Sequence, residues 1–215
     1  ESAEPFVPRP DLTGHGVASW DDEVADLQYR DVCEHAVGHN VALRKGHYGN
    51  ATLSRHPIVR GRNIDLTIGP RKRRGCQYTR IELGRDAGAR QRLEVFNLHL
   101  GLYERERIQQ LGCLARAAEF AALDPAEPCI IGGDFNDWRG LLPEILTEIL
   151  GFRCATGHKG GADQAIRTYP AFSPTGSLDR IFHRGGLRLL AARRCRLPVS
   201  RVASDHLPVI VDFEL

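Results

Sequence analysis

One short stretch constrains the fold more than any other: the apolar run Pro128–Ile131, which stops at Gly132-Gly133-Asp134. Such a run is typical of a buried strand, and Gly-Gly-Asp ends it sharply. Asp134 and Asn136 then stand two positions apart, so an extended backbone points both side chains the same way. A carboxylate and a carboxamide at the end of a buried strand suit a hard cation, a water and a phosphoryl oxygen.

Two later stretches repeat this pattern of a short apolar run beside polar groups that can bind metal or phosphate. Leu178–Phe182 carries Asp179, and Ser204–Pro208 carries Asp205 and His206. Taken singly, Gly-Asp after a strand is ordinarily a turn, and Ser-Asp-His is ordinarily a loop or a helix cap. Their occurrence together in one chain favours a common site.

A fourth motif lies upstream, where a strand is expected over Arg92–Leu98. Asn97 and His99 stand two apart at its end, so both side chains can face the same pocket. The order of the four motifs along the chain makes the combined signal strong.

In this order the motifs resemble the endonuclease/exonuclease/phosphatase superfamily, which includes pancreatic-type deoxyribonucleases, abasic-site endonucleases, sphingomyelinases and inositol-polyphosphate phosphatases. The resemblance runs from about Tyr48 to the C-terminus and includes a further family-like strand, Tyr48–Arg55. It is greatest to small bacterial members, which carry a similar Gly-Asn-Ala-x-Leu-Ser-Arg segment and end on a similar Ser-Asp-His-Leu-Pro. The implied fold is a four-layer α/β sandwich, deoxyribonuclease-like, with two face-to-face mixed β-sheets and outer helices.

The resemblance implies a divalent-metal-dependent phosphoesterase that hydrolyses a phosphodiester or phosphomonoester bond. Such a reaction needs an activated water, charge relief on the phosphoryl oxygens and a stabilised leaving alkoxide. His206 would contact the scissile phosphate, as a base or as a cationic stabiliser, with Asp179 fixing its tautomer. Asp134 would orient the attacking water, and His99 would bond the phosphate or the leaving oxygen.

Two asparagines and the metal ligands complete the implied site. Asn136 would donate to a phosphoryl oxygen, and Asn97 would bond the phosphate or the leaving oxygen. Oxygen ligands, with Asp205 among them, favour Mg²⁺ or Mn²⁺ over zinc. The superfamily opens with a strand ending in Asn and a second ending in Leu-Gln-Glu, whose Glu is the principal metal ligand. Neither motif occurs here, so we expect the first strands to lie upstream, and Glu1 is the remaining candidate for that ligand.

Size and charge bound the domain and its partners. At 215 residues, 42% of them hydrophobic, the chain can bury one sizeable core, which predicts a single domain over residues 1–215. The net charge of +2 is too small to prove a nucleic-acid partner, so the phosphate-ester substrate can be nucleic acid, a lipid head group or a small molecule. We expect a monomer. No run approaches transmembrane length, so stable membrane insertion is not expected.

A second class of function is a non-catalytic family member that binds a phosphorylated partner through a degraded site. The missing Leu-Gln-Glu motif is its only support, whereas every other site position is intact. We therefore favour the enzyme, although a shared fold does not choose the substrate.

Hydrophobic periodicity and turn signals predict a helix from Asp21 to about Val37, a strand pair Asn40–Leu43 and Asn50–Ser54 around a turn at Gly46–Gly49, and a long helix Glu104–Leu123. The basic segment Arg71–Arg74 precedes another strand. A solvated hairpin end is the favoured interpretation of this segment, and a phosphate-steering patch is the alternative.

The six cysteines show no Cys-x-x-Cys spacing, which argues against a zinc site. Cys113 and Cys129 fall in apolar patterns typical of buried thiols in a reducing compartment, which slightly favours the cytoplasm. Six is an even number, so disulfides stay open.

Overall fold

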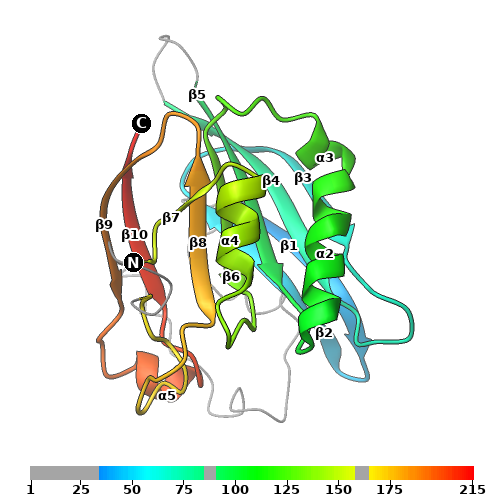
Figure 1. The fold of residues 1–215 in the computed structure, drawn as a ribbon, viewed down its shortest axis with the longest axis vertical. Coiled ribbons are helices and arrows are strands. Elements are labelled where there is room, and N and C mark those ends of the chain that lie inside the picture. The colour runs from blue at the N-terminus through cyan, green and yellow to red at the C-terminus, as the bar shows by residue number, and fades with distance from the viewer. Residues whose placement is uncertain (1–33, 85–90, 158–164) are drawn as a thin grey trace, which may run out of the picture.

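The structure, a computed structural model, describes residues 34–84, 91–157 and 165–215, and its largest element is a six-stranded sheet (Figure 1). The strands lie in the order β3-β4-β5-β6-β8-β7. Their bounds are β3 Ile58–Asp65, β4 Gly75–Leu83, β5 Gln91–His99, β6 Cys129–Asp134, β7 Arg153–Cys154 and β8 Asp179–Arg184. Within this sheet β5 and β6 pair in parallel and the other neighbours are antiparallel, so the sheet is mixed.

Two antiparallel hairpins face this sheet. The first joins β1 (Glu34–Leu43) to β2 (Gly46–Ser54), and the second joins β9 (Arg188–Arg194) to β10 (Val209–Glu214). The first hairpin lies against β3, β4 and β5, whereas β10 lies against β8. The described residues thus place strands of a second layer at both ends of the large sheet.

Amide side chains join the first hairpin to the sheet. Asn50 donates from Nδ2 to the carbonyl oxygens of Gly75 and Asn97, at 3.1 and 2.9 Å. Asn97 donates in return from Nδ2 to the carbonyl oxygen of Ala51 at 2.9 Å. Because these bonds satisfy backbone groups between two layers, they fix the position of β2 over β5.

Helices cover the opposite face of the six-stranded sheet (Figure 1). They are α2 (Glu104–Arg116), α3 (Ala118–Ala121), α4 (Leu142–Glu144) and the π-helix η2 (Ile145–Ile149), while the short α5 (Ser200–Ala203) precedes β10. The main core lies between these helices and the strands, and its fully buried members include Tyr78, Phe96, Leu114, Ile131, Phe135, Leu142, Leu146 and Phe182. Burial of each such side chain stabilises the fold by about 1.5–3 kcal/mol. The expected α/β sandwich is confirmed.

The N-terminal part of the prediction needs correction. Residues 34–37 begin β1 instead of ending a helix, and Glu34 pairs with Ser54 across the hairpin. Cross-strand pairing outweighed the weak helical pattern there. The turn is also misplaced: it lies at residues 44–45, and Gly49 is inside β2. A Cβ at Gly49 would lie 1.9 Å from the carbonyl oxygen of Gly38, so this glycine permits close strand contact.

The long helix begins at Glu104 as predicted but breaks at Ala117, whose backbone is extended (φ −62°, ψ 139°). Beyond the break, Glu119 pairs with Arg62 of β3 at 2.7 Å, so a tertiary contact accompanies the interruption. The sequence patterns did not indicate β3. Five consecutive residues of its eight are exposed, and apolar and polar residues do not alternate along it.

Cys76, Cys113, Cys129, Cys154 and Cys195 are all free thiols. None of the helices within the described ranges is long and apolar enough to cross a membrane. Glu1 and residues 21–33 of the predicted helix lie outside the described residues.

Candidate active site

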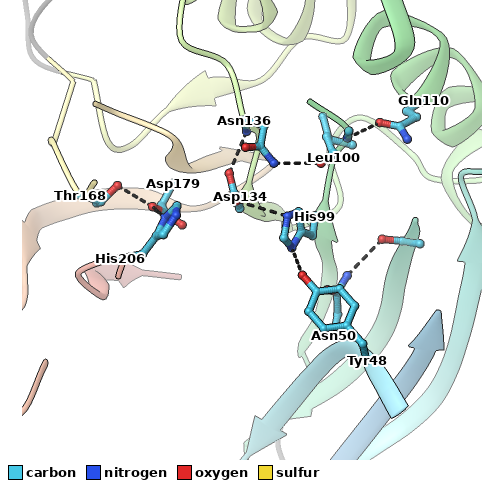
Figure 2. Close-up of polar contacts among 12 residues, drawn as sticks. Tyr48, Asn50, His99, Leu100, Gln110, Asp134, Asn136, Thr168, Asp179 and His206 are labelled. Atoms are coloured by element: carbon cyan, nitrogen blue, oxygen red, sulfur yellow. Dashed lines mark hydrogen bonds and ion pairs between the residues drawn. The ribbon is translucent and has the colours of Figure 1, made fainter. Parts of the chain in front are cut away.

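Three of the predicted catalytic residues form a row across adjacent strands. His99 of β5 stands opposite Asp134 of β6, and Asp134 stands opposite Asp179 of β8. Directly opposed residues in a sheet share a face, so the three side chains lie side by side. Figure 2 shows Asp134 between two groups, with His99 and Tyr48 on one side and Asp179 and His206 on the other.

The glycine before Asp134 allows the strands to approach. Gly133 has φ of 136°, a conformation that L side chains rarely adopt. A Cβ there would lie 1.9 Å from the carbonyl oxygen of Leu98 on β5. The Gly-Gly-Asp ending therefore sets the close contact of β5 and β6 as well as ending the strand.

A tight turn orients Asp134. Its Oδ1 accepts a 2.8 Å hydrogen bond from the backbone N–H of Asn136, which has φ of 49°. The Asn136 amide donates to the carbonyl oxygen of Leu100 at 3.0 Å. Burial raises the pKa of Asp134 to about 6, the nearby Asp179 carboxylate also raises it, and the Asn136 N–H opposes the shift. This carboxyl group therefore exchanges protons near neutral pH.

His99 is neutral and bridges Tyr48 and Asp134. Its Nδ1 lies 2.8 Å from the Tyr48 hydroxyl, and its Nε2 lies 3.4 Å from Asp134 Oδ2. Burial, then the charges of Arg74 and Lys72, lower the pKa of His99 to about 3, so the contact with Asp134 is not an ion pair. A carboxylate only accepts, so a proton on Nε2 suits this contact and leaves Nδ1 to accept from the Tyr48 hydroxyl.

His206 forms the second group with Asp179 and Thr168. Its Nδ1 lies 2.7 Å from Asp179 Oδ2, and the same oxygen accepts a hydrogen bond from the Thr168 hydroxyl. The hydrogen bond to Asp179 raises the pKa of His206, while burial opposes it. Nδ1 therefore carries a proton, and Nε2 is left for another partner. The ring of Tyr169 packs on the imidazole with centroids 4.9 Å apart.

A pocket of about 330 Å³ opens beside this second group, lined by Gly133, Asp179, Arg180, Ile181, Ser204, His206, Leu207, Pro208 and Val209. Clefts with convergent polar groups and shifted pKa values are where ligands bind. The pocket lies next to the His206 imidazole and the Asp179 carboxylate, two groups that the sequence predicted to be catalytic.

The remaining predicted residues occupy mixed positions. The Asn136 amide is buried and bonded to Leu100, and the Asn97 amide is bonded to Ala51, so each retains one N–H for a ligand. Asp205 is exposed beside His206 in sequence. Within residues 34–84, 91–157 and 165–215, no three His, Cys, Asp or Glu side chains cluster tightly enough to hold a metal.

Sequence reasoning missed two residues of the site. Tyr48 stands 51 positions from His99, and Thr168 stands 11 positions from Asp179. Tyr48 and Asn50 share one face of β2 by the period of two, which is the signal that could have drawn attention to Tyr48. Thr168 carries no comparable local signal.

Comparisons with known proteins agree with this geometry. The chain matches the Endonuclease/Exonuclease/phosphatase family over residues 8–206. It is 33% identical over 206 residues to the uncharacterized protein YbhP of Escherichia coli (strain K12), a match that covers 93% of this chain and 76% of YbhP.

Solved structures show the same fold at low identity. The mannosyl-6-phosphatase of Bacteroides thetaiotaomicron is 17% identical with a TM-score of 0.67, over 91% of this chain and 80% of that one. D. rerio TDP2, complexed with single strand DNA product, is 17% identical with a TM-score of 0.65, over 90% and 82%.

Proposed function

The chain belongs to the endonuclease/exonuclease/phosphatase family, and from this premise we propose that it is a divalent-metal-dependent phosphoesterase. The substrate carries a phosphodiester or phosphomonoester bond, in a nucleic acid, a lipid head group or a small phosphorylated molecule. The observation that carries the proposal is the row of His99, Asp134 and Asp179, with His206 bonded to its end. Relatives of this fold include a sugar phosphatase and a protein that holds a DNA product, which supports phosphate-ester chemistry without choosing the substrate.

His206 stabilises the phosphoryl group in this proposal. The hydrogen bond from Nδ1 to Asp179 raises the pKa of the ring, so His206 holds its proton more strongly than a free histidine does. Its Nε2–H then donates to a phosphoryl oxygen on which negative charge develops. Asp179 acts as a positioning residue, and Thr168 holds Asp179 in place.

Asp134 orients and deprotonates the attacking water. With a pKa of about 6, its carboxylate is ionised at neutral pH and is still basic enough to accept a proton. The water oxygen attacks phosphorus as its proton passes to Asp134, and the bond to the leaving oxygen breaks. That oxygen takes up a proton from solvent water, and Asp134 returns the proton it accepted to solvent. His99, whose Nε2 lies 3.4 Å from Asp134 Oδ2, keeps the carboxylate facing the water.

The metal part of the proposal rests on the family resemblance and on oxygen donors. Mg²⁺ or Mn²⁺ would supply Lewis acidity at the phosphoryl oxygens. Asp205 is the candidate ligand in the described part of the chain, and Glu1 lies outside it. The retained N–H groups of Asn136 and Asn97 would bind phosphate oxygens.

The rival proposal is a non-catalytic member that binds a phosphorylated partner. The assembled His206–Asp179 pair and the raised pKa of Asp134 favour catalysis, because a binding module needs neither a fixed tautomer nor a carboxyl group poised near neutral pH.

Hydrolysis of bis-p-nitrophenyl phosphate and p-nitrophenyl phosphate tests the proposal. We expect turnover of at least one of them with Mg²⁺ or Mn²⁺ and none after chelation. His206→Ala should lower kcat at least about a hundredfold, the usual scale for a lost acid/base or charge-stabilising group, and Asp179→Asn should lower it less. His35→Ala, an exposed histidine on β1, is the control and should keep the wild-type rate.

Turnover that persists unchanged in chelator would overturn the metal dependence. Wild-type rates in both site variants would overturn the roles of His206 and Asp179.

A further inference from the structure

A buried cation, Arg74, lies beside the catalytic row without a full set of partners. Its side chain is 5% exposed, and Nε and Nη1 have no hydrogen-bond partner among the residues that the structure describes. Buried polar groups are nearly always bonded, and an uncompensated buried charge is costly. The predicted solvated hairpin end is therefore wrong for Arg74, although Arg71, Lys72 and Arg73 are exposed.

The backbone around Arg74 is held on both sides. Its carbonyl oxygen accepts from the Leu66 N–H at 2.9 Å, and its own N–H donates to the Thr67 hydroxyl at 3.3 Å. Gly75, which follows, touches the first hairpin so closely that a Cβ would lie 2.0 Å from Asn40 Oδ1. Arg74 is thus fixed immediately before β4, whose neighbouring strand β5 carries His99.

The electrostatic neighbours of Arg74 belong to the site. Its charge lowers the pKa values of His99 and Asp134, and its charge and hydrogen bonding oppose the rise that burial causes in the pKa of Tyr48. The Lys72 ammonium lies 4.9 Å from the centre of the Tyr48 ring. Burial, then the charge of Arg74, lowers the pKa of Lys72, so the two cations repel each other.

Arg71, in the same basic segment, has a carboxylate partner. Arg71 pairs with Glu106 at 3.5 Å and stacks on the ring of Tyr103. In the described part of the chain, neither Arg74 nor Lys72 has a carboxylate within ion-pair distance. Two cations and a phenol therefore converge beside His99 with their charge unbalanced.

We infer that Arg74, Lys72 and Tyr48 form an anion subsite that binds a doubly charged phosphate group of the substrate next to His99. The guanidinium provides paired N–H donors that match phosphate oxygens, Lys72 adds a second positive charge, and the Tyr48 hydroxyl lies at the border with His99. A dianion balances both cations, whereas a phosphodiester carries one charge. The identification of the bound group as part of a substrate rests on the proposed function. Among the substrates of that function, the subsite selects those that carry a terminal phosphate monoester.

Calorimetric titration of the chain with inorganic phosphate at pH 8, without metal, tests the subsite. We expect binding that Arg74→Gln weakens at least about tenfold, since the charged guanidinium donors to the phosphate oxygens are lost. Arg73→Gln is the matched control, because this neighbouring arginine is exposed, and its affinity should stay within about twofold. Dimethyl phosphate, a monoanion, should bind more weakly than inorganic phosphate.

Thermal unfolding separates a ligand-binding role from a structural one. If the role of Arg74 is to bind an anion, Arg74→Gln without phosphate should unfold at the wild-type Tm or above it. Phosphate should raise the Tm of the wild type but not the Tm of the variant. If Arg74→Gln does not fold, Arg74→Lys keeps the charge and should still weaken phosphate binding.

Equal phosphate affinity in wild type and in the folded Arg74 variant, or a wild-type chain without affinity for phosphate, would overturn the inference. Neither readout uses turnover. Arg74-dependent phosphate binding in a chain that hydrolyses nothing would count against the proposed catalysis and leave the subsite standing.

Discussion

Asp134 combines burial with a functional charge, and this combination has a cost in stability. Its pKa in the folded chain is about 6, above the ordinary 3.8, so the folded state prefers the protonated carboxyl group. A raised folded pKa contributes stability that is fully present below pH 4 and is lost as the pH rises through 6. At neutral pH the ionised side chain therefore destabilises the fold by about 3 kcal/mol, at 1.36 kcal/mol per pKa unit.

Asp134→Asn should therefore stabilise the protein while it inactivates it. Asparagine keeps an oxygen that can accept from the Asn136 N–H, so the turn is retained. We expect the free energy of unfolding in urea to rise by about 3 kcal/mol at pH 7 and to change little at pH 4. Asp124→Asn is the control, since Asp124 is exposed and makes the same kind of turn with Ala126. A loss of stability at pH 7 would contradict the assignment.

The pH dependence of kcat/KM follows from Asp134 and His206. Activity requires Asp134 ionised, so it falls as the pH drops through about 6. It also requires His206 protonated, so it falls as the pH rises through a pKa above the ordinary 6.5. The expected profile is a bell. Asp179→Asn removes the main cause of the raised His206 pKa, so in that variant the alkaline limb should move to lower pH. An alkaline limb that stays in place would show that another group is titrating.

At the scale of elements, the contact of β5 with β6 depends on Gly133. An alanine there needs a positive φ and places its Cβ against the carbonyl oxygen of Leu98. We expect Gly133→Ala to lower the free energy of unfolding by roughly 3 kcal/mol or more, measured in urea. Gly186→Ala is the matched control, because a Cβ at that position would have nothing within 4 Å and the backbone φ there is ordinary. A comparable cost in both variants would contradict the role of close strand approach.

The sequence predicted a strand well where buried and partly exposed side chains alternate with a period of two, as in β5, and it also predicted the mostly buried β4. It failed where pairing partners decide the outcome. Residues 34–37 are extended because β2 is beside them, and β3 is mostly exposed. The local sequence pattern indicates neither fact, because both depend on contacts with strands elsewhere in the chain.

At the scale of the molecule, some residues of the site could be predicted from the sequence and others could not. Asp134, Asp179 and His206 could be identified because each stands in a short motif with its own backbone signal. Tyr48 and Arg74 were missed, since their importance comes from lying close to His99 although they belong to other parts of the chain. A buried arginine is also rare enough that exposure is the natural expectation for a run of basic residues.

The row of opposed residues also limits how such a chain can change over generations. Side chains alternate between the two faces of a strand, so inserting one residue inside β5, β6 or β8 would turn His99, Asp134 or Asp179 toward the helices. Insertions between strands leave that parity untouched. Loop lengths are therefore free to diversify what the cleft accepts, while the spacing within these three strands must be inherited unchanged.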